Sequence, residues 1–180
     1  MLDGELPAGH FAGWTTHFAQ ERQVTEADTH SVVIFRIGAE WLALPTAVFK
    51  EVATLRPIHS LPHRRNGVVL GLVNVRGELL VCVSPGDVLG LDKNAGAEPD
   101  KTHAVHRRLL VASREGSRMA FPVDEVHGIH RFHPRELQEV PATVAGAKGT
   151  YTKAMLAWNG RTVGCLDDQL LFYTLNRSLA

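Results

Sequence analysis

The side chains best suited to chemistry in this chain of 180 residues are ten histidines. Three of them, His127, His130 and His133, recur at intervals of three, which would suit a metal site if they met. On a strand, however, His127 and His133 face one way and His130 faces the other. No carboxylate or cysteine lies at a convincing ligand spacing. A His-rich metal-binding protein is therefore the least favoured alternative, and we expect no metal and no cofactor.

The two cysteines, Cys82 and Cys165, are the other candidates for chemistry. They are too few for a disulfide framework, and neither belongs to a C-x-x-C pair. They fall in matching segments of the two halves of the chain. We therefore interpret both as small buried apolar residues at equivalent positions.

Motifs that bind nucleotides or carry a nucleophile are missing from the sequence. It contains no P-loop, no G-x-G-x-x-G and no G-x-S-x-G. A phosphoacceptor histidine would normally lie on a helical domain beside a nucleotide-binding domain, and neither pattern is visible. We predict no catalytic residue and no enzymatic activity.

Charge and hydropathy indicate which classes of partner the chain is not suited to bind. Basic and acidic residues number 19 each, and the pI is near 7.2, so there is no long-range positive field to attract nucleic acid or an anionic membrane. No apolar run approaches the ~20 residues of a membrane helix. His10 and His17 interrupt the region where a signal peptide would be apolar. We expect a cytoplasmic protein that neither binds nucleic acid nor inserts into the membrane.

Most of the chain shows the alternation of apolar residues that is typical of short strands. Val33, Phe35 and Ile37 share one face of such a strand. Residues 67–83 form two further apolar runs, which turn at Arg76-Gly77-Glu78. These patterns predict an all-β core built from hairpins.

Helical spacing is confined to the two ends of the chain. Near the N-terminus, Trp14 and Phe18 lie four residues apart and predict a short helix that packs against a barrel or a partner. Near the C-terminus, Leu171 and Leu175 share a helical face, and Asp167 is placed to cap that helix.

The order of strand, turn, strand and proline occurs twice, on either side of a small, polar, proline-bearing stretch. The closing pair Leu44-Pro45 recurs as Phe121-Pro122, which indicates a duplicated small β-barrel. We therefore predict a helical extension at 1–30, a first barrel at 31–90, a linker at 91–105, and a second barrel with the C-terminal helix at 106–180.

The stretch at 71–81, which reads G-L-V-N-V-R-G-E-L-L-V, resembles the CheW family of chemotaxis coupling proteins. The family pattern there is G-x-x-N-x-R-G followed by an aliphatic strand. Residues 33–52, the F-P-V-D-E-V at 121–126 and the hairpin at 157–167 resemble the same family, so the similarity spans about 31–175.

This resemblance implies two five-stranded barrels of the Src-homology-three (SH3) type, with a short N-terminal helix and a C-terminal helix. It implies an adaptor without catalysis or cofactor, which holds the regulatory domain of a CheA-type histidine kinase against the cytoplasmic tip of a methyl-accepting chemoreceptor. The kinase-contact residues are not identified by it.

The same resemblance implies a receptor-binding site at Arg76, Asn74, Glu51 and Phe49. Arg76 stands at a hairpin tip, where its guanidinium fork suits receptor carboxylates or helix-end carbonyls. Glu51 and Phe49 match the acidic and apolar positions after the second strand and would supply a polar rim and an apolar anchor. Phe49 is equally compatible with a core position.

The chain also departs from the common pattern. Ser84-Pro85 stands where the family usually has aspartate. The N-terminal stretch at 14–19 lies outside the common core, and it makes the chain similar to coupling proteins of surface-sensing (Wsp-type) pathways, which control a diguanylate cyclase. A self-assembling structural protein of a signalling array remains the main alternative, because two barrels with exposed strand edges can polymerise.

Overall fold

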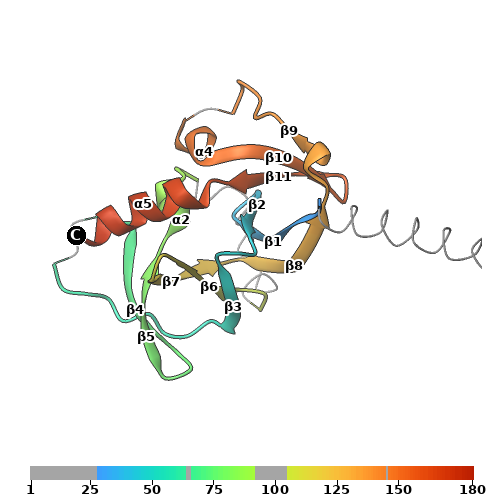
Figure 1. The fold of residues 1–180 in the computed structure, drawn as a ribbon. Helices are drawn as coiled ribbons and strands as arrows, with labels where there is room; N and C mark the ends of the chain where they lie inside the picture. The colour runs from blue at the N-terminus through green and yellow to red at the C-terminus, as the bar shows by residue number, and fades with distance from the viewer. Residues whose placement is uncertain (1–27, 64–65, 92–104, 145) are drawn as a thin grey trace, which may run out of the picture.

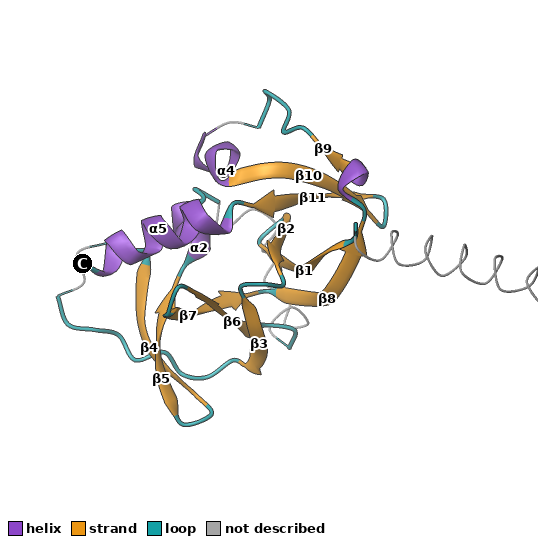
Figure 2. Cartoon of the chain, in the orientation of Figure 1, coloured by secondary structure: helices purple, strands orange, loops and turns teal. Residues whose placement is uncertain are grey.

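The computed structural model describes residues 28–63, 66–91, 105–144 and 146–180. The expected N-terminal helix around Trp14 and Phe18, and nearly all of the expected linker at 91–105, lie outside these ranges. Within them the chain is built mainly from strands, which confirms the predicted all-β class (Figure 2).

Short strands follow one another with brief connections and four short helical segments in the described residues (Figure 1). The strands are β1 (His30–Ile37), β2 (Glu40–Pro45), β3 (Phe49–Thr54), β4 (Val69–Val75), β5 (Glu78–Val83), β6 (Arg108–Arg114), β7 (Ser117–Val123), β8 (Glu125–Phe132), β9 (Leu137–Gln138), β10 (Thr152–Trp158) and β11 (Arg161–Leu166). The helices are α2 (Pro85–Val88), the 3-10 helix η1 (Pro134–Glu136), α4 (Gly146–Tyr151) and α5 (Asp168–Leu179).

Tight turns close three of the antiparallel hairpins. Each turn has two central residues with positive φ, the conformation that matches the natural twist of paired strands. Glycine takes the second position every time, since it meets no steric penalty there. The three pairs are Arg76-Gly77, Glu115-Gly116 and Asn159-Gly160.

Two sheets result, and they share one plan. The five-stranded sheet has the order β3-β6-β7-β5-β4, and the six-stranded sheet has the order β8-β1-β2-β11-β10-β9. If β6–β11 of the second half are matched to β1–β5 of the first, omitting the two-residue β9, the two orders are the same. The repeat read from the sequence is therefore present in the strand pairing.

The expected division into barrels at 31–90 and 106–180 does not describe the sheets. Each sheet takes a two-stranded hairpin from one half of the chain and its other strands from the other half. Parallel pairs join the two contributions, β5 with β7 and β2 with β11. Equivalent strands carry equivalent apolar patterns, so local periodicity predicts each strand but does not decide which hairpin it joins.

The helix α5 lies against the core that the two sheets share. Asp167 caps it by accepting a hydrogen bond from the Leu170 amide at 3.1 Å, as predicted. Leu171 and Leu175 are fully buried in a cluster with residues of β1, β2, β6 and β7. Phe172 meets Phe121 edge-on, with ring centroids 6.3 Å apart. This packing joins the two sheets into one body.

Each sheet also has an apolar interior of its own, and each interior holds one cysteine. Cys82 lies opposite Ala120 in the parallel ladder of the five-stranded sheet, and Cys165 lies opposite Ala43 in that of the six-stranded sheet. Both are free thiols and both are buried. The interpretation of equivalent buried positions is confirmed.

Burial sets the reactivity of these thiols. It raises the pKa of Cys82 from 9.0 to about 12 and that of Cys165 to about 11. We expect neither to react with iodoacetamide near pH 8 in the native protein, and both to react quickly after unfolding in guanidinium chloride, because the thiolate is the nucleophile. Mass spectrometry of alkylated protein measures this. Rapid alkylation of the native protein at either cysteine would contradict the buried assignment.

Candidate functional site

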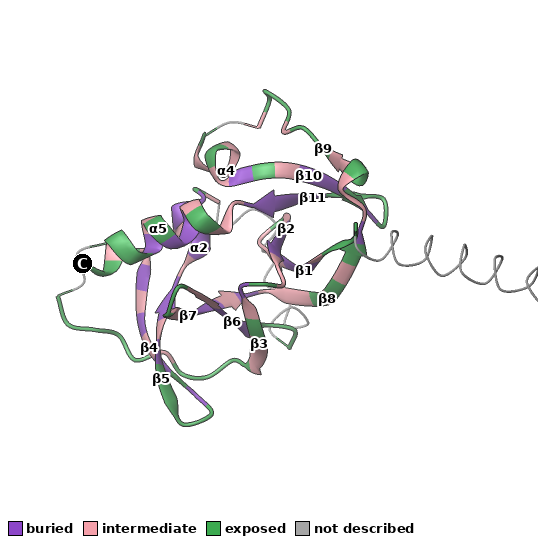
Figure 3. Ribbon diagram, in the orientation of Figure 1, coloured by how far each residue is buried: buried purple, intermediate pink, exposed green. Residues whose placement is uncertain are grey.

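The β4–β5 hairpin projects from one end of the five-stranded sheet, and its tip is exposed (Figure 3). Asn74 shapes the tip, since its Oδ1 accepts a hydrogen bond from the Gly77 amide at 2.8 Å. Arg76 adopts a left-handed conformation with φ 51° at the turn. Its side chain is 78% exposed, so the turn holds a guanidinium where a partner can reach it.

Arg76 is one of four charged side chains that form a network beside this tip. Its Nε lies 2.9 Å from Oε2 of Glu51 on β3. Arg118 on β7 donates to Oε1 of the same carboxylate at 3.1 Å and to Oε2 of Glu78 on β5 at 2.8 Å. The carboxylate of Glu51 therefore lies between two cations. We call Glu51, Arg76, Glu78 and Arg118 the tip network.

Burial differs across the tip network. The side chain of Glu51 is 20% exposed, whereas that of Arg76 is 78% exposed. A partly buried carboxylate needs cationic partners to remain ionised at low cost, whereas an exposed ion pair contributes little stability. Glu51 is thus tied into the fold, and Arg76 is free to change partners with little loss.

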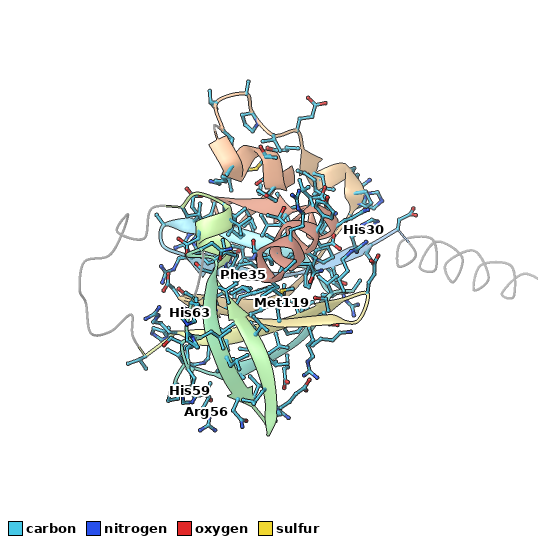
Figure 4. All side chains as sticks on the ribbon, turned by 90° about the vertical axis from the view of Figure 1, so that its left-hand side faces the viewer. His30, Phe35, Arg56, His59, His63 and Met119 are labelled. Carbon is cyan, nitrogen blue, oxygen red and sulfur yellow. The ribbon has the colours of Figure 1, made fainter. Side chains whose placement is uncertain are left out.

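A small pocket adjoins the tip network between β3 and β4. It has a volume of about 190 Å³ and is lined by Val52, Ala53, Thr54, Arg56, Asn74, Val75 and Arg76. Figure 4 shows Arg56 and His59 on the segment that runs beside the β4–β5 hairpin. This segment is tied to β4 by two hydrogen bonds of 2.8 Å between the backbones of His59 and Leu72.

Three of the four residues predicted for the receptor site therefore lie together, namely Glu51, Asn74 and Arg76. Phe49 does not join them at the surface. It is half-buried against the core shared by the two sheets, and an irregularity in the β3–β6 pairing separates it from Glu51. A core position for Phe49 fits this packing, and an interface role for Phe49 stays a prediction.

The three histidines singled out in the sequence do not converge. His127 packs edge-on against Trp158 at 4.3 Å, and His130 stacks on Phe132 at 6.4 Å. His133 caps η1 by accepting a hydrogen bond from the Arg135 amide at 3.2 Å. In the ranges that the structure covers, no three potential ligands gather around a possible metal position. Each histidine instead has a local packing or capping contact.

Comparison with known proteins identifies the family to which this fold belongs. Residues 31–175 match the family model of the CheW-like domain. The chain belongs to the CheW-like family. The chemotaxis protein CheW of Rhizobium meliloti (strain 1021) is 25% identical over 149 residues, which cover 83% of this chain and 91% of that protein. The crystal structure of the scaffolding protein TtCheW from Thermoanaerobacter tengcongensis is similar in fold, with a TM-score of 0.65 at 16% identity, covering 79% of this chain and 87% of that one.

Membership explains the architecture. The two sheets are the two SH3-like subdomains of the CheW-like fold, as the resemblance implied. CheW-like proteins are scaffold proteins and not enzymes. Among the residues described, no helix is long and apolar enough to cross a membrane.

The departure from the CheW-like pattern at Ser84-Pro85 has a local explanation. Ser84 is the N-cap of α2, and its hydroxyl accepts from the Asp87 amide at 3.4 Å. Pro85 occupies the first turn of that helix, where its missing N–H is not needed. A Ser-Pro pair therefore starts this helix without the family's aspartate.

Sequence reasoning missed two members of the tip network, Glu78 and Arg118. Arg118 reaches the hairpin only because β7 pairs with β5 in parallel, and that pairing joins distant parts of the chain. Sequence reasoning also missed Leu79, a large apolar residue that is 63% exposed and lies opposite Asn74 in the hairpin. Leu79 did carry a signal, since it is an aliphatic residue next to the polar turn.

Proposed function

We propose that this chain is an adaptor that couples the cytoplasmic tip of a methyl-accepting chemoreceptor to a CheA-type histidine kinase. Membership in the CheW-like family supports the scaffold role. The observation that supports the receptor site is the tip network, in which an exposed Arg76 is aimed outward by a turn that Asn74 fixes.

The chemistry of the site suits a helical partner that carries a carboxylate. A guanidinium has five N–H donors in a planar fork, so the ion pair that Arg76 makes through Nε does not exhaust its capacity. Leu79 on the same hairpin is 63% exposed and offers apolar surface to a partner. An amphipathic receptor helix would place an acidic group on Arg76 and an apolar side chain on Leu79.

The proposal also covers where in the cell the adaptor acts and which pathway its kinase serves. An adaptor of this kind acts in the cytoplasm, where receptor tips and kinases meet. We place it in a surface-sensing pathway that controls a diguanylate cyclase, on the similarity of the N-terminal stretch at 14–19. Deleting the gene and measuring cyclic-di-GMP on a surface tests that placement, and an unchanged level with lost swimming control would point to a flagellar motor instead.

Titration of purified components tests the adaptor role against the self-assembling alternative. By sedimentation velocity, the chain alone should remain near the 19.7 kDa monomer over a wide concentration range and gain mass when a receptor-tip fragment or a kinase regulatory domain is added. Growth of the chain into large assemblies without either partner, and no mass gain with them, would favour the structural alternative.

A further inference from the structure

Arg118 is the member of the tip network that the receptor role does not yet explain. It bridges Glu51 and Glu78 with hydrogen bonds of 3.1 and 2.8 Å, and its side chain is 36% exposed. Its Nε is buried and has no hydrogen-bond partner within the described part of the chain. Its two terminal nitrogens thus serve carboxylates on two different strands, β3 and β5.

The internal repeat shows a different residue type at the equivalent position of the other barrel. Met119, the residue after Arg118, pairs with Val81, and Leu42, the residue after Trp41, pairs with Gly164 in the equivalent parallel ladder. Trp41 therefore occupies the matching place in the six-stranded sheet.

Trp41 fills its position with an aromatic contact and a cation–π contact. Its ring lies 5.2 Å from that of Trp158, and the Arg161 guanidinium lies 4.9 Å from its centre. Arg161 in turn takes the hairpin position of Glu78, since each follows its turn and pairs with the last residue of the preceding strand. One barrel thus has an aromatic cluster where the other has a network of opposite charges. The Arg118 side chain is 36% exposed, and ion pairs with this much exposure usually contribute little stability, so stability alone does not explain Arg118.

We infer that Arg118 is a positioning residue for receptor binding, which keeps Glu51 paired when Arg76 turns to a carboxylate of the receptor. Without Arg118, Glu51 would depend on Arg76, and recruiting Arg76 would leave a partly buried carboxylate without a cation. With Arg118 in place, Arg76 can be shared at little cost. This inference rests on the proposed receptor site and adds a residue to it.

Substitution of Arg118 tests the inference by titration of a receptor-tip fragment. Arg118→Met keeps the apolar stem and should weaken binding about three- to thirtyfold, as expected when a charge coupled to an interface is removed. Arg118→Lys should recover part of this loss, since an ammonium restores the charge but not the fork that spans two carboxylates. Arg36→Met is the matched control, because Arg36 pairs with Glu125 at 3.3 Å on the other sheet and should change binding by less than about twofold.

Coupling to Arg76 separates positioning from a general structural role. In an Arg76→Ala background, Arg118→Met should weaken binding by less than about twofold more, because Arg118 acts through Arg76. Fully additive losses would overturn the inference. So would wild-type affinity of Arg118→Met beside a weakened Arg76→Ala, whereas unchanged affinity in both variants would remove the whole receptor site and with it the proposed function of the tip.

A milder variant keeps the test decisive if Arg118→Met does not fold. Glu78→Gln releases one anchor of Arg118 at a side chain that is 52% exposed. It should leave the melting temperature unchanged and weaken receptor binding about two- to fivefold. Wild-type affinity in a folded Glu78→Gln protein would count against the positioning role.

Discussion

Replacing Gly71 with alanine should remove a large share of the stability of this protein. A Cβ at Gly71 would lie 2.1 Å from the carbonyl oxygen of His59 and 2.7 Å from its carbonyl carbon, both backbone atoms held by the His59–Leu72 bridge. The residue also has φ +146°, which non-glycine residues rarely adopt. Overlap with backbone and an unfavourable φ together should cost about 3 kcal/mol or more, out of the roughly 5–15 kcal/mol typical of a domain.

A second glycine separates the two causes. Gly128 also has a positive φ, of +128°, close to that of Gly71, but a Cβ there would meet no atom within 4 Å. Gly128→Ala should therefore lose less, about 1–2 kcal/mol, the cost of the backbone conformation alone. Urea unfolding of both variants gives the comparison. Equal losses would show that contact with His59 is not what requires glycine at position 71.

Replacing Arg76 with alanine should weaken receptor binding by about 1–3 kcal/mol, or roughly five- to a hundredfold, as is usual when an interfacial charge partner is lost. The fold should remain, with stability changed by less than about 0.5 kcal/mol, because the side chain is exposed and Glu51 keeps its bond to Arg118. Lysine should rescue only in part, since it lacks the planar fork.

Two measurements on each Arg76 variant belong together. Thermal unfolding of the isolated protein reports on the fold, and titration of a receptor-tip fragment at one fixed salt concentration reports on docking. Unchanged affinity would remove Arg76 from the site. A collapse of the melting temperature would show instead that Arg76 is a structural tie of the tip network, and lost binding would then say nothing about recognition.

Local structural features could be predicted from the sequence, because they depend only on neighbouring residues. The turn at Arg76-Gly77 follows from glycine at a position with positive φ. The C-terminal helix follows from Asp167 at its cap and from leucines on one face. The repeat likewise appears in the equivalent places of Cys82 and Cys165.

Features that depend on the pairing of strands far apart in the sequence could not be predicted from the sequence. Strands of the two halves share one apolar pattern, so the sequence gives no reason for β6 and β7 to join β3 rather than β8. The bridge from Arg118 to Glu51 depends on this exchange. For the same reason, half of the tip network could be named from a motif and the other half only from the structure.

The repeat also shows where equivalent positions differ. Gly71 lies opposite Cys82 after an irregularity in the β4–β5 ladder, and Ala154 lies opposite Cys165 after the same irregularity in β10–β11. Ala154 does not share the positive φ of Gly71 among the described residues. The positive φ at position 71 and the close approach of the His59 backbone, rather than the irregularity in the ladder, therefore make glycine necessary there.

Reconstituted control of kinase phosphorylation tests the adaptor role most directly. A receptor-tip fragment assembled on vesicles, a CheA-type kinase and this chain are combined, and phosphate incorporation is followed with and without the chain and with Arg76→Ala. We expect kinase activity to respond to the receptor only when the wild-type chain is present, while the Arg76→Ala chain still binds kinase but couples it weakly. Receptor control that is equal without the chain, or equal with Arg76→Ala, would contradict the account.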